Sequence, residues 1–197
     1  MRAATSEPPP VGADAPEASR AGVRARIGWL LLRARLRGRL RLQGRVSAGP
    51  GVRIALAPGA ALELGDGVEL GAGTRIEATD AGVRIGAGTR VGERCTVAAT
   101  TSIEIGAGCA LGDFVYVSDS DPGTADVDTP VRLQPLRRAP VWIGDGARLG
   151  AHSAILAGAR VGDGAVVGSY AVVRGNVPRG AVVTSAGRSR GASISSS

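Results

Sequence analysis

Residues 143–173 read IGDGARLGAHSAILAGARVGDGAVVGSYAVV, in which a large aliphatic residue returns at every sixth position. A helix repeats its apolar residues every three or four positions and an isolated strand every two, so a sustained period of six fits neither. It is typical of a solenoid built from short strands and turns. The same period, in groups of three, covers Leu64, Leu70, Ile76, Ile85, Val91, Val97, Ile105, Leu111, Val117, Ile143, Leu149, Ile155, Val161, Val167 and Val173.

The other positions of the hexad support a solenoid. When each aliphatic residue is position 1, position 2 is mostly glycine, which eases the bend at a corner. Position 5 holds small residues that fit a narrow interior, among them Cys95, Thr101 and Cys109. We expect both cysteines to be buried there without a disulfide. Three hexads form one eighteen-residue coil, and stacked coils bury the aliphatics. The sequence therefore predicts an all-β fold with the shape of a triangular prism.

The repeats of residues 143–173 and the Asn176-Val177-Pro178 that follows resemble the C-terminal half of hexapeptide-repeat acyltransferases. The likeness is greatest to the maltose/galactoside O-acetyltransferases and the polysaccharide O-acetyltransferases, and it covers residues 46–190. It implies a left-handed parallel β-helix. It also implies a homotrimer with an acetyl-CoA site in the groove between neighbouring subunits.

Composition divides the chain into four segments. Residues 1–19 lack an apolar rhythm and are expected to form a disordered tail. Residues 20–45 are expected to form a basic cap with a short N-terminal helix and a strand. Residues 46–185 form the predicted left-handed β-helix, with an inserted loop at 118–140, and residues 186–197 form a C-terminal tail.

The basic character of the chain lies in one segment. The formal net charge is +7, and residues 20–45 hold nine arginines and no acidic residue. The absence of a nucleic-acid-binding motif argues against a nucleic-acid partner. Two interpretations of the amphipathic pattern at 20–33 stay open: a cap over the open end of the solenoid, or peripheral contact with an anionic membrane surface.

The longest apolar run in this part of the chain is Trp29–Leu32, too short for a secretory signal or a membrane span. A cytoplasmic location is therefore expected. If residues 20–45 contact a membrane, they do so at its inner face.

The loop at 118–140 is where the resembling family carries its catalytic base. The family stretch resembles Asp-His-Asp-His-Gly and aligns with Asp119 to Gly123 here, so both histidines are missing. Pro122 stands at the place of the catalytic imidazole, and proline cannot accept a proton. The resemblance therefore implies an acyltransferase whose usual base is replaced.

His152 is the single histidine of the chain and the candidate catalytic residue. Acyl transfer to a hydroxyl needs a base with a pKa near neutrality. His152 occupies the outward position 4 of its hexad, beside the groove where the resemblance places the thioester. Two alternatives stay open: His152 has a surface or intersubunit role, or an aspartate or the substrate itself accepts the proton.

The resemblance also assigns contacts with the cofactor. It implies that Ala151, Ser169 and Arg174 line the pantetheine channel and that Arg190 meets the nucleotide phosphates. Asp119 and Asp121 are candidates for orienting an acceptor sugar, with solvated loop carboxylates as the alternative. No metal is expected, since the acidic residues of the loop lack the spacing of a calcium loop.

Two functions are compatible with these features. The first is a CoA-dependent acyltransferase of the O-acetyltransferase type, acting on the hydroxyl of a small-molecule or glycan acceptor. The second is a catalytically inactive trimer that serves as a binding or scaffold protein. A γ-type carbonic anhydrase shares the architecture but needs three histidines per zinc, so the single histidine excludes it.

Overall fold

The structure is a computed structural model that describes residues 36, 38–122, 134–185 and 189–190. The predicted tail at 1–19 and the predicted helix within 20–33 lie outside these residues. Within the described ranges, no helix is long and apolar enough to cross a membrane.

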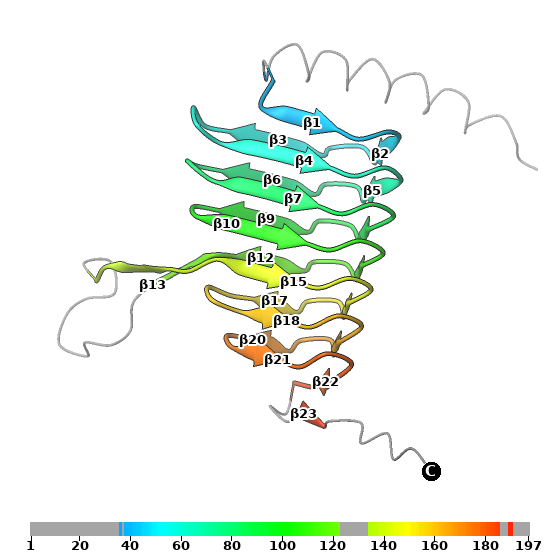
Figure 1. Cartoon of the computed structure of the whole chain (residues 1–197), viewed down its shortest axis with the longest axis vertical. Helices are drawn as coiled ribbons and strands as arrows, with labels where there is room; N and C mark the ends of the chain where they lie inside the picture. Colours follow the sequence, from blue (N-terminus) through cyan, green and yellow to red (C-terminus); the bar gives the residue numbers. More distant parts are fainter. Residues whose placement is uncertain (1–35, 37, 123–133, 186–188, 191–197) are drawn as a thin grey trace, which may run out of the picture.

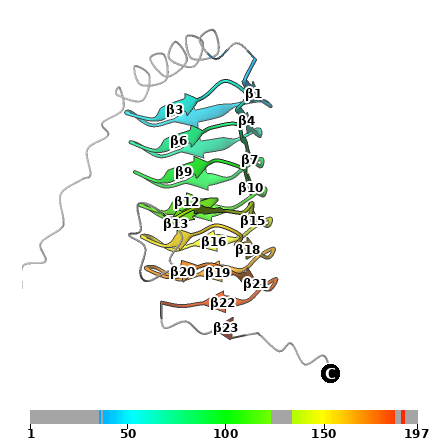
Figure 2. The same ribbon diagram turned by 90° about the vertical axis from the view of Figure 1, so that its left-hand side faces the viewer.

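Short strands wind into a prism with three sheets, stacked coil upon coil, and all their strand pairs are parallel except the last pair of the second sheet (Figures 1 and 2). The first sheet contains β1 (Leu40–Leu42), β4 (Ala61–Leu64), β7 (Gly82–Ile85), β10 (Ser102–Ile105), β15 (Val141–Ile143), β18 (Arg160–Val161) and β21 (Asn176–Val177). The second contains β2 (Val46–Ala48), β5 (Val68–Leu70), β8 (Arg90–Val91), β11 (Ala110–Leu111), β16 (Arg148–Leu149), β19 (Val166–Val167), β22 (Val182–Val183) and β23 (Ser189–Arg190). The third contains β3 (Arg53–Leu56), β6 (Arg75–Ala78), β9 (Thr96–Ala99), β12 (Tyr116–Ser118), β17 (Ala154–Ile155) and β20 (Val172–Val173). The predicted left-handed parallel β-helix is confirmed.

The aliphatic residues at position 1 of the hexads form the core. Leu64 pairs in register with Ile85, Ile85 with Ile105, and Ile105 with Ile143, and all four side chains are buried. Each aliphatic residue is thus covered above and below by its equivalents in the neighbouring coils. The interior is one continuous apolar column, which only stacking creates.

The coils are not all eighteen residues long. Leu64 pairs with Ile85, more than eighteen positions away, because the strands of the third sheet and the turns after them are longer in the early coils. Thr101 falls in one of these longer turns and is exposed, so its predicted place in the interior is wrong. Ala99 and Ile103 fill the interior on either side of it.

The solenoid begins earlier than the sequence predicts. Strand β1 pairs with β4, with Leu40 opposite Leu62, so residues 40–45 belong to the first coil rather than to a separate cap. Leu36 and Leu40 are buried and extend the core at this end.

The glycines at position 2 allow neighbouring coils to approach closely. A β-carbon placed on Gly86 would lie 2.5 Å from the Ala107 nitrogen, and one placed on Gly112 would lie 2.7 Å from the Ala151 nitrogen. Real β-carbons do not approach backbone atoms so closely, so any side chain here would push the coils apart. Inter-coil contact, in addition to the bend itself, explains glycine at this position.

Both cysteines are free and buried, as predicted. The Cys95 thiol donates to the Gly112 carbonyl at 3.1 Å, and the Cys109 thiol to the Gly144 carbonyl at 3.1 Å. Burial raises the pKa of the Cys95 thiol to about 11 and also raises the pKa of the Cys109 thiol. Both groups therefore act as small interior residues that satisfy a carbonyl of the next coil.

We expect neither thiol to react with an aromatic disulfide reagent at pH 8 while the chain is folded. The thiolate is the reactive form, and burial disfavours it. The raised pKa also means that the folded state keeps these protons to a higher pH than the unfolded state does. This contribution to stability is complete below the ordinary thiol pKa and is lost as the pH rises toward about 11. Thiol titration with and without denaturant checks the prediction, and rapid labelling of the native chain would contradict it.

Candidate functional site

The three corners of the prism expose different residues. We call the turns between the first and second sheets the glycine corner, and those between the second and third sheets the histidine corner. The turns that lead from the third sheet to the next coil form the hairpin corner. Ala151, His152 and Ser169 lie at the histidine corner, and Asp121 and Arg174 lie at the hairpin corner.

His152 is the middle ring of an aromatic stack at the histidine corner. Its ring centroid lies 4.7 Å from that of Phe114 and 4.9 Å from that of Tyr170, with interplanar angles of 5° and 2°. The Arg94 guanidinium extends the column, with its central carbon 5.7 Å from the Phe114 centroid. These four residues form what we call the ring ladder.

Coil-to-coil hydrogen bonds put the rings in register. The His152 N–H donates to the Asp113 carbonyl at 2.9 Å, and the Tyr170 N–H donates to the Ala151 carbonyl at 3.1 Å. The side chains of the ring ladder therefore stand at equivalent points of successive turns. The stack has a signal in the sequence, since Phe114, His152 and Tyr170 all occupy position 4 of their hexads, although only His152 is a candidate site residue on sequence grounds.

The stack leaves the imidazole edge of His152 open. The two neighbouring rings cover both faces, while the residue as a whole is exposed. Within the described part of the chain, neither ring nitrogen of His152 has a hydrogen-bond partner. Both nitrogens are thus available to a ligand, in an orientation that the stack determines.

A β-hairpin leaves the prism at the hairpin corner. Strands β13 (Ser120–Pro122) and β14 (Leu136–Arg138) pair antiparallel and stand away from the stacked coils (Figure 1). The Asp121 carboxylate accepts a charge-assisted bond from Arg174 Nε at 3.3 Å, which ties the hairpin to a lower coil. Asp121, the candidate for orienting the acceptor, and Arg174, which the resemblance places in the pantetheine channel, therefore contact each other. The Arg174 side chain remains 62 % exposed, so its terminal nitrogens stay accessible.

The structure corrects the expectation for Asp119. Its side chain is 0 % exposed. The carboxylate accepts the backbone N–H groups of Thr100 at 2.7 Å, Thr101 at 2.6 Å and Ser102 at 2.7 Å, and the Thr100 hydroxyl at 2.9 Å. The carboxylate of Asp119 is committed to the turn of the preceding coil and is not open to an acceptor.

The candidate residues form two separate groups within one copy of the chain. Strands β17 and β20 of the third sheet run between the histidine corner and the hairpin corner. Ala151, His152 and Ser169 therefore lie at one edge of this sheet, and Asp121 and Arg174 at the other. Arg190 lies apart from both groups, on β23, which pairs antiparallel with β22.

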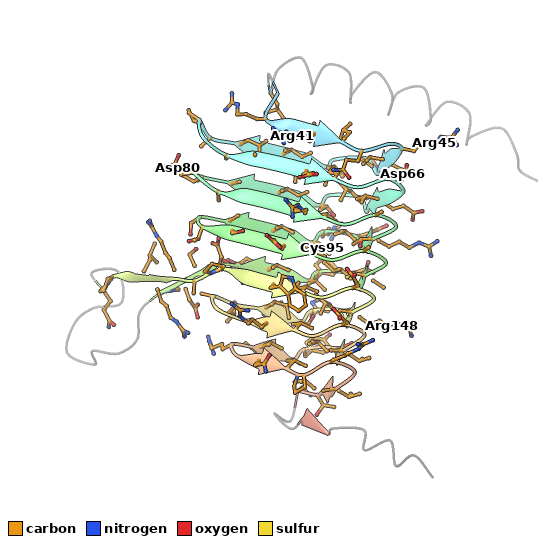
Figure 3. The ribbon with its side chains drawn as sticks, viewed as in Figure 1. Arg41, Arg45, Asp66, Asp80, Cys95 and Arg148 are labelled. Carbon is orange, nitrogen blue, oxygen red and sulfur yellow. The ribbon has the colours of Figure 1, made fainter. Side chains whose placement is uncertain are left out.

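Exposed arginines lie on different sides of the last coils, one beside each of the three sheets. Arg148, Arg160 and Arg174 are exposed, and Figure 3 shows Arg148 at the outer edge of the stack. The corner aspartates nearby are engaged with the backbone: Asp145 accepts the Ala107 N–H at 2.8 Å, and Asp163 accepts the Asp145 N–H at 3.1 Å. These coils can therefore meet an anionic ligand. No group of three or more His, Cys, Asp or Glu residues is placed to hold a metal ion in the described ranges.

Two families of hexapeptide repeats match the chain. The family described as bacterial transferase hexapeptide (six repeats) matches residues 140–175. The family described as the hexapeptide repeat of succinyl-transferase matches residues 82–118. The two matches fall on the coils on either side of the hairpin.

The chain is also similar to individual proteins. It is 33 % identical over 152 residues to a probable acetyltransferase of Mycobacterium tuberculosis, an alignment that covers 76 % of this chain and 51 % of the relative. The chain thus spans about half the length of this curated relative.

Solved structures share the fold. A variant of AntD, an N-acyltransferase from Bacillus cereus in complex with dTDP and coenzyme A, superposes with a TM-score of 0.60 at 16 % identity, covering 75 % of this chain and 84 % of AntD. The polysialic acid O-acetyltransferase OatWY superposes with a TM-score of 0.59 at 18 % identity, covering 77 % and 87 %. The repeat matches show that the chain carries hexapeptide repeats of the bacterial transferase type on both sides of the hairpin, and the sequence relative and the two solved structures to which it is similar are acyltransferases.

Proposed function

We propose that the chain is a CoA-dependent acyltransferase of the O-acetyl type that modifies a hydroxyl of a sugar or glycoconjugate. The observation that carries the proposal is the open imidazole edge of His152, held in the ring ladder beside Ala151 and Ser169. The M. tuberculosis relative supports acetyl transfer, and OatWY is a fold neighbour that acetylates a polysaccharide.

The residues of the last coils fit acetyl-CoA, which supplies the acyl group as an activated thioester. Ala151 and Ser169 have short side chains, which leave room along the histidine corner for a slender pantetheine arm. The exposed guanidinium of Arg174 suits an anionic part of the cofactor, because arginine binds two phosphate oxygens at once. We assign Arg190 to the nucleotide phosphates.

His152 acts as the base in this proposal. Its free ring nitrogen takes the proton of the acceptor hydroxyl while the hydroxyl oxygen bonds to the acyl carbon and the carbon–sulfur bond breaks. His152 then gives the proton to the departing thiolate, so that free thiol and ester are the products. A positioned base of this kind contributes about a hundredfold to ten-thousandfold in rate.

Assembly into a homotrimer completes the proposed site. The histidine and hairpin corners of one copy are separated by the third sheet. In the cyclic trimer that we propose, the hairpin corner of one copy lies against the histidine corner of the next. Apolar side chains support this contact. Tyr116, Tyr170 and Val172 are exposed on or beside the third sheet, and Leu136 is exposed on the hairpin.

Release of free thiol from acetyl-CoA in the presence of monosaccharides, oligosaccharides and lipid-linked glycans tests the proposal. We expect acceptor-dependent release by the native chain. The comparison variant is Pro122→His, which restores an imidazole where the family carries its base. A silent native chain with an active Pro122→His variant would instead support the binding or scaffold function.

A further inference from the structure

The ring ladder occupies a strained backbone position. Arg94, Phe114, His152 and Tyr170 have φ values of 52°, 57°, 59° and 60°, in the left-handed region that side chains disfavour. The equivalent turns of the glycine corner, from the one after β4 to the one after β21, adopt the same conformation with glycine at every position. Those residues are Gly67, Gly88, Gly108, Gly146, Gly164 and Gly180.

The contrast between these corners indicates a role for the side chains. Both corners make the same turn, and glycine makes it without strain. At the histidine corner, three successive coils instead have a ring-bearing residue, Phe114, His152 or Tyr170, in the left-handed conformation, which is energetically unfavourable for a residue with a side chain. Strain that recurs in this way points to a function of the residues concerned.

The stack restrains the imidazole. Rotation of the His152 ring would break its parallel contacts with both Phe114 and Tyr170. A catalytic histidine is commonly oriented by a hydrogen bond from one ring nitrogen to a carboxylate or carbonyl. Within the described residues His152 has no such bond, so its two ring neighbours are what orient it.

We propose that Phe114 and Tyr170 are positioning residues that clamp His152 with its edge toward the acceptor hydroxyl. The catalytic meaning of this clamp rests on the proposed function, whereas its geometry does not. Neither residue touches the reacting atoms in this proposal. Their contribution is to hold the base in the orientation for proton transfer.

Proton NMR tests the geometry without any turnover. Because the chain has a single histidine, its imidazole ring protons need no assignment among several residues. We expect these resonances to lie upfield of their positions in the urea-unfolded chain, because the ring currents of Phe114 and Tyr170 shield both faces. The Phe114→Leu and Tyr170→Leu substitutions each remove part of the shift, while Tyr170→Phe keeps it.

Trp142 provides the matched control. It is an exposed aromatic residue on the first sheet, away from the histidine corner, so Trp142→Leu leaves the His152 resonances unchanged. Unshifted imidazole resonances in the native chain would overturn the clamp, as would a native shift that survives both leucine substitutions.

Kinetics test the catalytic meaning of the clamp. We expect Phe114→Leu and Tyr170→Leu to lower kcat by about tenfold or more while KM for acetyl-CoA stays unchanged, since a loosened base misplaces the proton acceptor. Tyr170→Phe keeps the native kcat. A raised KM with native kcat would overturn the positioning role. A native chain without turnover that shows the ring-current shift would refute the proposed function and leave the clamp geometry supported.

Discussion

Substitution of His152 by alanine is expected to lower kcat for acyl transfer by about a hundredfold or more. The chain contains one histidine, and Pro122 occupies the place of the usual base, so no other imidazole replaces it. Thiol release from acetyl-CoA at saturating acceptor measures the effect. We expect the KM for acetyl-CoA to change little, because His152 acts on the acceptor proton.

The matched variant for this prediction is His152→Phe. Phenylalanine keeps an aromatic ring between Phe114 and Tyr170 but cannot carry a proton. If proton transfer is the role of His152, the phenylalanine variant folds normally and is as inactive as the alanine variant. Native turnover by His152→Phe would show that another group is the base and that the role of His152 is limited to ring stacking with Phe114 and Tyr170.

Substitution of Asp119 by alanine is expected to destabilise the fold by at least about 3 kcal/mol. The buried carboxylate accepts four hydrogen bonds from residues 100–102, and alanine leaves three backbone N–H groups of that turn without their acceptor. These N–H groups point at a fully buried carboxylate, so without it they lose strong charge-assisted hydrogen bonds. Urea denaturation at a fixed protein concentration measures the loss.

Asp66 is the control for this substitution. It is exposed, and one of its carboxylate oxygens accepts the Arg45 N–H at 2.6 Å (Figure 3). We expect Asp66→Ala to lower the free energy of unfolding by about 1 kcal/mol or less, because it removes one hydrogen bond from an exposed carboxylate to a backbone N–H. Equal effects of the two substitutions would contradict the structural role given to Asp119.

The aliphatic period was sufficient to predict a solenoid of stacked coils, because one type of side chain repeats at one position of every turn, and the handedness followed from the family resemblance. Ile143, Leu149 and Ile155 mark the three sides of a single coil, and their register partners mark the sides of the others. A pattern of this kind leaves no competing structure, since a helix or an isolated strand would scatter these residues over several faces.

Local sequence could not predict where the coils lengthen, nor that Asp119 is buried and bonded to the turn of the preceding coil. Threonine is small enough for the interior and polar enough for a turn, so Thr101 fitted both places. Asp119 lies near other loop acids in the sequence, and its partners belong to the preceding coil. Its burial depends on the distance between coils, which a linear pattern does not contain.

The ring ladder was only partly predictable. Position 4 of the hexad is outward-facing, so the sequence placed His152 on the surface correctly. The parallel contact with Phe114 and Tyr170 follows from the shared turn conformation of three coils, which becomes visible only when the coils are stacked. The separation of the two corners by the third sheet likewise required the structure.

Activity of mixed assemblies tests most directly the claim that the site forms between copies. The two parents are His152→Ala, which alters the histidine corner, and Arg174→Glu, which alters the hairpin corner, and we expect each alone to be inactive. After joint unfolding and refolding at equal amounts, random mixing in a cyclic trimer gives intact sites at roughly a quarter of the native number. Recovery to that level is the predicted result, and a mixture no more active than its parents would contradict the account.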